Sequence, residues 1–131
     1  MNISRHMIAS LCGVPMLSMD LPAISETERR IIRRWLGFYE EHLPTFRDGK
    51  WRIDYYQSNT AYMSVTGKDE CIVILLDPAR LNHALAGAAK RVTVLNLSEY
   101  ELELPGAETS DGEGNACKAG VIPPGGAGVL N

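Results

Sequence analysis

Asp20 is the candidate substrate-binding residue of this sequence. It follows an apolar stretch over residues 7–19, which we interpret as a strand buried on both faces, as strands of parallel sheets are. In a β/α barrel the active site lies at the ends of such strands, so a carboxylate there would face the ligand. The alternative is a turn residue whose side chain caps local backbone amides.

The carboxylates of this chain do not form the pair that glycoside cleavage needs. That pair comes from two separate strand ends facing one sugar, and only one such strand is expected here. Glu40 and Glu41 cannot replace it, because neighbouring residues on a helix point in different directions. His6, His42 and His83 show no metal-ligand spacing. We therefore expect no catalytic residue, no metal and no cofactor in this chain.

Aromatic residues cluster in a segment that we expect to form strands, namely Trp51, Tyr55, Tyr56 and Tyr62. Exposed aromatic rings on a sheet could stack against sugars. Aromatic residues are also simply favoured in strands. We favour packing in the core or between strands over a binding surface.

Two other motifs have simple interpretations. Arginine pairs at 29–30 and 33–34 form a basic patch at helical spacing, but no aromatic residues interleave them and the net charge is −3. A solvated helix face explains them better than nucleic-acid binding. Residues 125–128 resemble a phosphate loop only in composition, since no Lys-Ser/Thr and no helix follow. We interpret them as a turn.

The composition is that of an ordinary soluble domain. The chain has 131 residues, of which 45% are hydrophobic and 22% charged. Its slightly acidic charge gives no general attraction to nucleic acid or to an anionic membrane, and no stretch is long enough to span one. Cys12, Cys71 and Cys117 leave at least one thiol unpaired. We expect a cytoplasmic protein with neither a nucleic-acid nor a membrane partner.

A long helix follows the apolar stretch. Ser25 and Glu28 form a capping box, and apolar residues recur at helical spacing, which predicts a helix over residues 25–43. We expect Pro44 to end it. Residues 1–44 are then interpreted as the terminal β/α unit of a catalytic barrel.

After Pro44 the apolar period changes from helical to two, which predicts strands over 51–56, 61–65, 71–76, 91–97 and 99–104. We expect residues 79–90 to form a loop with at most one helical turn, residues 105–118 an exposed loop or weak hairpin, and 120–122 with 128–130 a last strand. We therefore predict that residues 45–131 form an antiparallel β-sandwich, which makes the fold of the chain mainly β. The residues expected to be largely buried are Trp51, Ile53, Ile72, Ile74, Val92, Val94, Leu102 and Leu104.

The stretch "GVPMLSMDLPAISETERRIIRRWLGFYEEH" resembles the last barrel strand and helix of the melibiase-like alpha-galactosidases, a group of retaining glycoside hydrolases. The matching features are an apolar strand, Asp20 with Leu21, and a helix that opens with Ser25 and Glu28. "WLGFYEEHLPTF" resembles the helix that leads from the barrel to a C-terminal β-sandwich, and "VIPPGGAGVLN" resembles the closing strand of that sandwich. The resemblance places the nucleophile and the general acid on earlier barrel strands and Asp20 near the site.

The resemblance implies a C-terminal, non-catalytic fragment of a glycoside hydrolase that acts on alpha-galactosides or related alpha-glycosides, with the sandwich bracing the barrel. Its expected partner is the rest of that barrel. A homo-oligomer could form through the exposed barrel remnant at residues 7–21, because an apolar strand with open edges tends to pair with another chain. The alternative is a stand-alone β-sandwich module that binds carbohydrate or protein.

Overall fold

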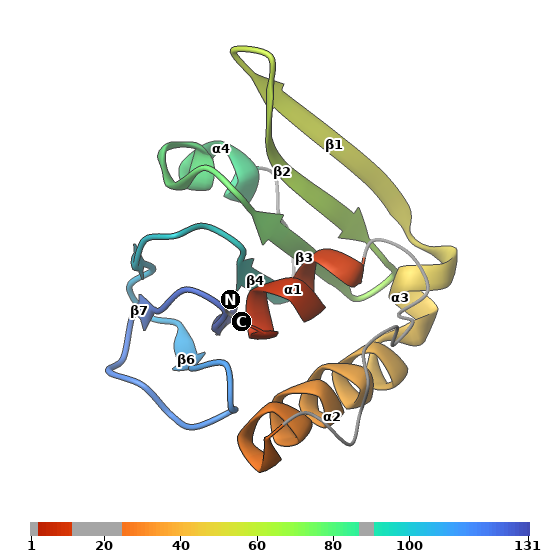
Figure 1. Ribbon diagram of the computed structural model, residues 1–131. Coiled ribbons are helices and arrows are strands. Elements are labelled where there is room, and N and C mark those ends of the chain that lie inside the picture. The colour runs from red at the N-terminus through yellow and green to blue at the C-terminus, as the bar shows by residue number, and fades with distance from the viewer. Residues whose placement is uncertain (1–2, 12–24, 87–90) are drawn as a thin grey trace.

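The computed structural model describes residues 3–11, 25–86 and 91–131. Three helices precede a six-stranded mixed sheet and a small two-stranded sheet (Figure 1). The described strands form no closed barrel. Asp20 and the rest of residues 12–24 lie outside the described residues.

The first helix, α1 (Ile3–Ser10), corrects the prediction of a strand over residues 7–19 in its described part. Ile3, Met7, Ile8 and Leu11 are all buried, and their spacing places them on one helix face. This apolar stripe starts upstream of residue 7. A stretch that is taken to begin at residue 7 leaves out Ile3, so the helical spacing is not visible and the apolar residues resemble a buried strand.

The second helix, α2 (Glu26–Glu41), confirms the predicted helix and its capping box. The Ser25 Oγ accepts a hydrogen bond from the Glu28 amide at 3.1 Å, and Glu28 Oε1 accepts one from the Ser25 amide at 3.0 Å. A short helix, α3 (Leu43–Asp48), follows at once. Pro44 lies in its first turn, where a proline needs no amide hydrogen. The proline therefore separates two helices and does not end helical structure.

The large sheet has the strand order β1-β2-β3-β4-β8-β6. The strands predicted over 51–56, 61–65 and 71–76 are confirmed as β1 (Lys50–Tyr56), β2 (Asn59–Thr66) and β3 (Glu70–Leu75). The first two form an antiparallel hairpin. β4 (Arg91–Asn96) runs parallel to β3, whereas the other neighbouring strands are antiparallel. The prediction of a purely antiparallel sheet is therefore wrong.

The parallel pair has a direct cause in the connection between β3 and β4. This connection contains a 3-10 turn (Pro78–Arg80) and the single-turn helix α4 (Leu81–Leu85). A parallel pair needs a long crossover that returns the chain to the edge where the previous strand began, and residues 76–90 supply that length. The loop with one helical turn that was predicted over residues 79–90 is thus confirmed over 79–86, and residues 87–90 lie outside the described residues. Its consequence for strand direction was not predicted.

The C-terminal third divides between the two sheets. β5 (Leu102–Glu103) pairs with β7 (Val121–Ile122) in the small sheet. β8 (Ala127–Leu130) instead lies between β4 and β6 (Glu108–Ser110) in the large sheet. The predicted single last strand is therefore two strands, because a turn at Gly125, with φ of 81°, redirects the chain between them.

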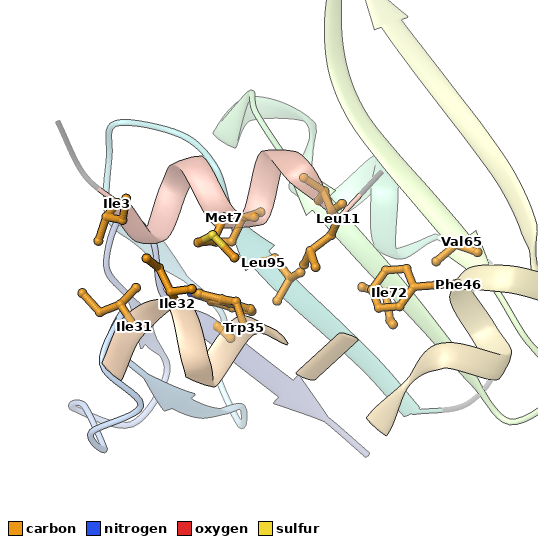
Figure 2. Close-up of a cluster of buried hydrophobic side chains, with 13 residues drawn as sticks. Ile3, Met7, Leu11, Ile31, Ile32, Trp35, Phe46, Val65, Ile72 and Leu95 are labelled. Carbon is orange, nitrogen blue, oxygen red and sulfur yellow. The ribbon is translucent and has the colours of Figure 1, made fainter. Parts of the chain in front are cut away.

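Side chains are buried on both faces of the large sheet. On one face the helices cover Ile72, Ile74 and Leu95, and Figure 2 shows Trp35 and Ile32 of α2 beside Met7 of α1 in this cluster. This cluster joins residues from both sides of Pro44. On the other face the small sheet and α4 cover a second cluster formed by Ala61, Tyr62, Val73, Leu75, Leu81, Val92, Val94, Leu102, Leu104, Ala107 and Ile122.

Most of the predicted core is confirmed. Ile72, Ile74, Val92, Val94, Leu102 and Leu104 are buried. Trp51 is partly buried and packs against the helix-facing cluster. Ile53 is 50% exposed, so its predicted burial is wrong. In Figure 1 the outer part of the β1–β2 hairpin extends beyond the described helices.

Candidate functional site

A groove of about 780 Å³ lies where the end of α2, α3, the β2–β3 turn and the start of β4 meet. Its lining mixes acidic and basic side chains, and the charged ones are Glu41, Asp48, Lys50, Lys68, Asp69, Glu70 and Arg91. The groove is therefore polar and close to neutral in net charge.

Glu70 links the helices to the sheet beside this groove. Thr45 Oγ1 donates a hydrogen bond to Glu70 Oε2 at 2.8 Å, and His42 Nδ1 lies 2.8 Å from the same oxygen. The side chains of His42 and Glu70 are only 10% and 15% exposed. A carboxylate on one ring nitrogen fixes the orientation of an imidazole. The pair therefore positions the α2–α3 junction on the sheet and presents two titratable groups to the groove.

Gly67 permits this close packing. A Cβ at this position would lie 2.6 Å from Thr45 Oγ1, a contact that would displace the threonine from the Glu70 carboxylate. The β2–β3 turn and α3 therefore approach as closely as they do because residue 67 has no side chain.

A second polar group, the Asp54 cluster, joins β1, β2 and the α4 region. It consists of Arg52, Asp54, Tyr56, Tyr62, Arg80 and His83. Residues 52, 54 and 56 share one face of β1, because side chains alternate along a strand. Tyr62 is directly opposite Asp54 in the β1–β2 register.

Asp54 is the centre of this cluster. Its side chain is 16% exposed, and its Oδ2 lies 3.3 Å from Arg80 Nη2 and 3.7 Å from His83 Nδ1. Its Oδ1 lies 3.6 Å from Arg52 Nη2. Three basic groups therefore surround one carboxylate, so the cluster is well suited to bind groups that both donate and accept hydrogen bonds.

Two tyrosines complete the cluster. The Tyr62 hydroxyl lies 2.9 Å from His83 Nδ1, and burial, together with the charge of Asp54, raises the pKa of this tyrosine. The Arg80 guanidinium carbon lies 4.9 Å from the ring centroid of Tyr56, a cation–π contact. Tyr56 nevertheless remains 44% exposed.

The four aromatic residues considered in the sequence do not form one platform. Tyr62 is 2% exposed, and Trp51 donates its Nε1 hydrogen to the Phe46 carbonyl at 3.1 Å, so both pack as we favoured. Tyr55 and Tyr56 are exposed, but they point to opposite faces of β1 because they are adjacent in the strand.

The basic patch on α2 is only partly a solvated face. Arg29, Arg30 and Arg33 are exposed as expected. Arg34 instead is partly buried and donates to Ser110 Oγ at 2.8 Å and to the Gly112 carbonyl at 3.3 Å. Burial lowers the pKa of Arg34. This arginine ties α2 to the loop after β6.

The two carboxylates on which these clusters depend, Glu70 and Asp54, were not predicted from the sequence. His42 and His83 looked scattered because Glu70 and Asp54, the carboxylates they face, come from different strands at no fixed spacing. The turn predicted over residues 125–128 is confirmed only at its start, where the Gly126 amide donates to the Pro123 carbonyl at 2.9 Å, because residues 127 and 128 belong to β8. Asp20 lies outside the described residues, so its predicted role stays a prediction.

Within the described ranges, no three His, Cys, Asp or Glu side chains gather closely enough to hold a metal ion. In the same ranges, no helix is both long and apolar enough to cross a membrane. Comparisons with protein-family models, with curated proteins and with solved structures give no match to this chain.

Proposed function

We propose that this chain is a non-catalytic, carbohydrate-binding module of a glycoside hydrolase that acts on alpha-galactosides or related alpha-glycosides. The Asp54 cluster is the observation that carries this proposal. It combines an exposed tyrosine ring with carboxylate, guanidinium and imidazole groups on one face of the sheet. A sugar presents the complementary surfaces, since its C–H face packs on an aromatic ring and its hydroxyls exchange hydrogen bonds with charged groups.

The geometry of Tyr56 and Arg80 suits this role. The guanidinium over one face of the Tyr56 ring holds the ring in place, so little side-chain freedom is lost when a ligand packs against it. Arg80 also contacts Asp54, which connects the ring to the hydrogen-bonding groups. The side chains of Arg80 and His83 are 25% and 43% exposed, so both remain open to a ligand beside Tyr56.

The placement in a glycoside hydrolase rests on the resemblance in sequence. The run from α2 through α3 into β1 supports it, because a helix followed directly by a β-rich unit is what the resemblance implies. In that setting the sheet would also brace the catalytic barrel, and Asp20 would lie near the sugar. The free thiols of Cys71 and Cys117 support a reducing compartment, such as the cytoplasm.

Calorimetric titration with methyl alpha-galactoside and with an oligosaccharide ending in alpha-galactose tests the binding role. We expect saturable binding by the wild type and at least about a tenfold loss of affinity in Tyr56→Ala, which removes the stacking ring. The matched control is Tyr100→Ala, because Tyr100 is 67% exposed and lies outside the cluster. Its affinity should equal that of the wild type.

Two results would contradict the proposal. One is an absence of binding by the wild type to either sugar, and the other is an equal loss of affinity in the two tyrosine variants. The stand-alone alternative predicts the same binding but a different genetic context. Several hundred upstream residues with β/α periodicity in the same reading frame would favour the glycoside hydrolase.

A further inference from the structure

The strand β1 forms one edge of the large sheet. Among the described residues it pairs with β2 alone, and Figure 1 shows it at the outer side of the hairpin, where no other described element covers its far edge. An uncovered edge carries a row of backbone amide and carbonyl groups that another strand can pair with.

The side chains of β1 do not protect this edge. Ile53, Tyr55 and Tyr56 are 50%, 63% and 44% exposed, and they are three of the four large hydrophobic side chains that are exposed in the described residues. Edge strands are usually shielded by a proline, by charged side chains or by a bulge in the strand itself. The charged residues near the middle of β1, Arg52 and Asp54, have opposite signs, so they can pair between two antiparallel copies. The bulge in this hairpin places its extra residue, Ala61, in β2, so β1 runs without interruption.

We propose that two copies of this chain pair through β1, antiparallel and about a two-fold axis, to extend the sheet across the dimer. A two-fold axis perpendicular to the sheet leaves every side chain on the face that it already occupies. Residues that lie opposite each other in two paired strands must also have their side chains on one face. The axis therefore has to place one residue of β1 opposite the same residue of the second copy. Only registers centred on a single residue of β1 are therefore allowed.

The sequence of β1 selects one of these registers. Centring the axis on Ile53 pairs all seven residues of Lys50–Tyr56, because Ile53 is the middle residue of the strand. Arg52 then faces Asp54 of the partner subunit, and Trp51 faces the partner's Tyr55. Centring the axis on Arg52 or on Asp54 would instead bring two like charges together, which is destabilising. The register with the longest overlap is thus also the one with complementary charge.

The positions of these charges are compatible with the pairing. The Arg52 side chain is 64% exposed, and its contact with Asp54 of its own chain is a loose one at 3.6 Å. It can therefore reach a neighbouring strand without leaving a buried carboxylate unpaired, since Arg80 continues to hold Asp54. Trp51, Ile53 and Tyr55 share the other face, so pairing also joins the apolar side chains of two copies.

Site-specific disulfides test the register. Residues directly opposite in antiparallel strands have Cα atoms about 4.5–5.5 Å apart, within the range of a disulfide. In the proposed register Ile53→Cys places two thiols opposite each other, whereas Tyr55→Cys places them several residues apart. We expect Ile53→Cys to give a covalent dimer under mild oxidation. Tyr55→Cys and the wild type, which carries the native cysteines, should remain largely monomeric on a non-reducing gel.

Charge reversal provides the second test, with mass measured by light scattering over a concentration series. Arg52→Glu should weaken the dimer at least about tenfold, because the lost pair occurs twice. Mixing Arg52→Glu with Asp54→Lys should restore association as a heterodimer, in which both opposing pairs again have opposite charge. Circular dichroism identifies a variant that has not folded, and in that case the disulfides still decide the register.

Three outcomes would overturn the proposal. They are a wild type that stays monomeric at every concentration, equal cross-linking of the Ile53→Cys and Tyr55→Cys variants, and a dimer that Arg52→Glu leaves unchanged. None of these measurements depends on sugar binding, so the proposal stands or falls separately from the proposed function.

Discussion

At the scale of single residues, buried polar side chains connect segments that are far apart in the sequence. Ser4 Oγ donates to the Gly125 carbonyl at 2.6 Å and accepts from Trp35 Nε1 at 2.7 Å. Fully buried Asn96 donates to two backbone carbonyls, at 2.8 and 3.0 Å. Leaving such a group unpaired costs about 1–3 kcal/mol. These side chains therefore help to select which segments meet.

Tyr62 makes the stability of this protein decrease at alkaline pH. Its raised pKa means that the folded state keeps the hydroxyl proton after the unfolded chain has lost it above the ordinary value of 10.0. The contribution of the hydroxyl to stability is therefore complete below that pH and is lost as the pH rises. We expect Tyr62→Phe to be less stable than the wild type by about 1 kcal/mol near neutral pH. Urea unfolding should show this difference shrinking at alkaline pH.

The sign of this change is the decisive part of the measurement. Tyr100→Phe, at a position that is 67% exposed, serves as the control for removing a tyrosine hydroxyl as such. A gap between wild type and Tyr62→Phe that widens as the pH rises would contradict the assignment, because it would mean that the folded state favours the charged tyrosine.

The residues of the two polar clusters could not be predicted from the sequence. Glu70 meets His42 only because β3 begins beside the α2–α3 junction, and Asp54 meets Arg80 only because the crossover after β3 returns over the hairpin. Neither contact has a characteristic spacing. The exposed Tyr56, by contrast, belonged to the aromatic group that the sequence did single out.

At the scale of elements, the start of α2 depends on one side chain more than on its neighbours. The Ser25 hydroxyl accepts from the Glu28 amide, which has no partner within the helix. We expect Ser25→Ala to lower the free energy of unfolding by about 1 kcal/mol, the usual cost of losing such a cap. Chemical denaturation followed by circular dichroism measures this change.

Thr27→Ala is the matched control for this prediction. Thr27 is exposed in the same turn of α2, and alanine has the higher helix propensity. It should leave stability unchanged or raise it slightly. If the two variants lost equal stability, the cap would not be the feature that matters at this helix end.

Elements with a local signal were predicted, and the pairing between strands far apart in the sequence was not. The helix with its capping box and the β1–β2 hairpin follow from residues close in sequence. The parallel direction of β4 depends on the path of a crossover, which has no local signal. The predicted strands over 99–104 and 120–122 are present only in part, as the two-residue strands β5 and β7, and their pairing with each other has no local signal. The strand β6 was not predicted, because it pairs with β8, far along the chain.

At the scale of the whole molecule, the sheet is the layer that two separate clusters share. Neighbouring residues of β3 and β4 point to opposite faces, with Ile72 and Ile74 toward the helices and Val73 and Leu75 toward the small sheet. Strands buried on both faces have continuous apolar sequences. Such a layer couples the packing on its two sides, because a displacement of either cluster shifts the same backbone.

The boundary that the sequence suggested near residue 44 leads to the last prediction. If residues 1–44 and 45–131 were separate units, a defect in α2 would leave the sheet unaffected. Trp35, however, is fully buried in the cluster that contains Ile72, Ile74 and Leu95 of the sheet. We therefore expect Trp35→Ala to cost about 3–5 kcal/mol and to reduce hydrogen-exchange protection in α2, β3 and β4 together. Trp35→Phe, which mainly loses the donor to Ser4, should have a smaller effect of the same kind. Faster exchange in α2 with unchanged protection in β3 and β4 would show instead that the helices and the sheet unfold independently.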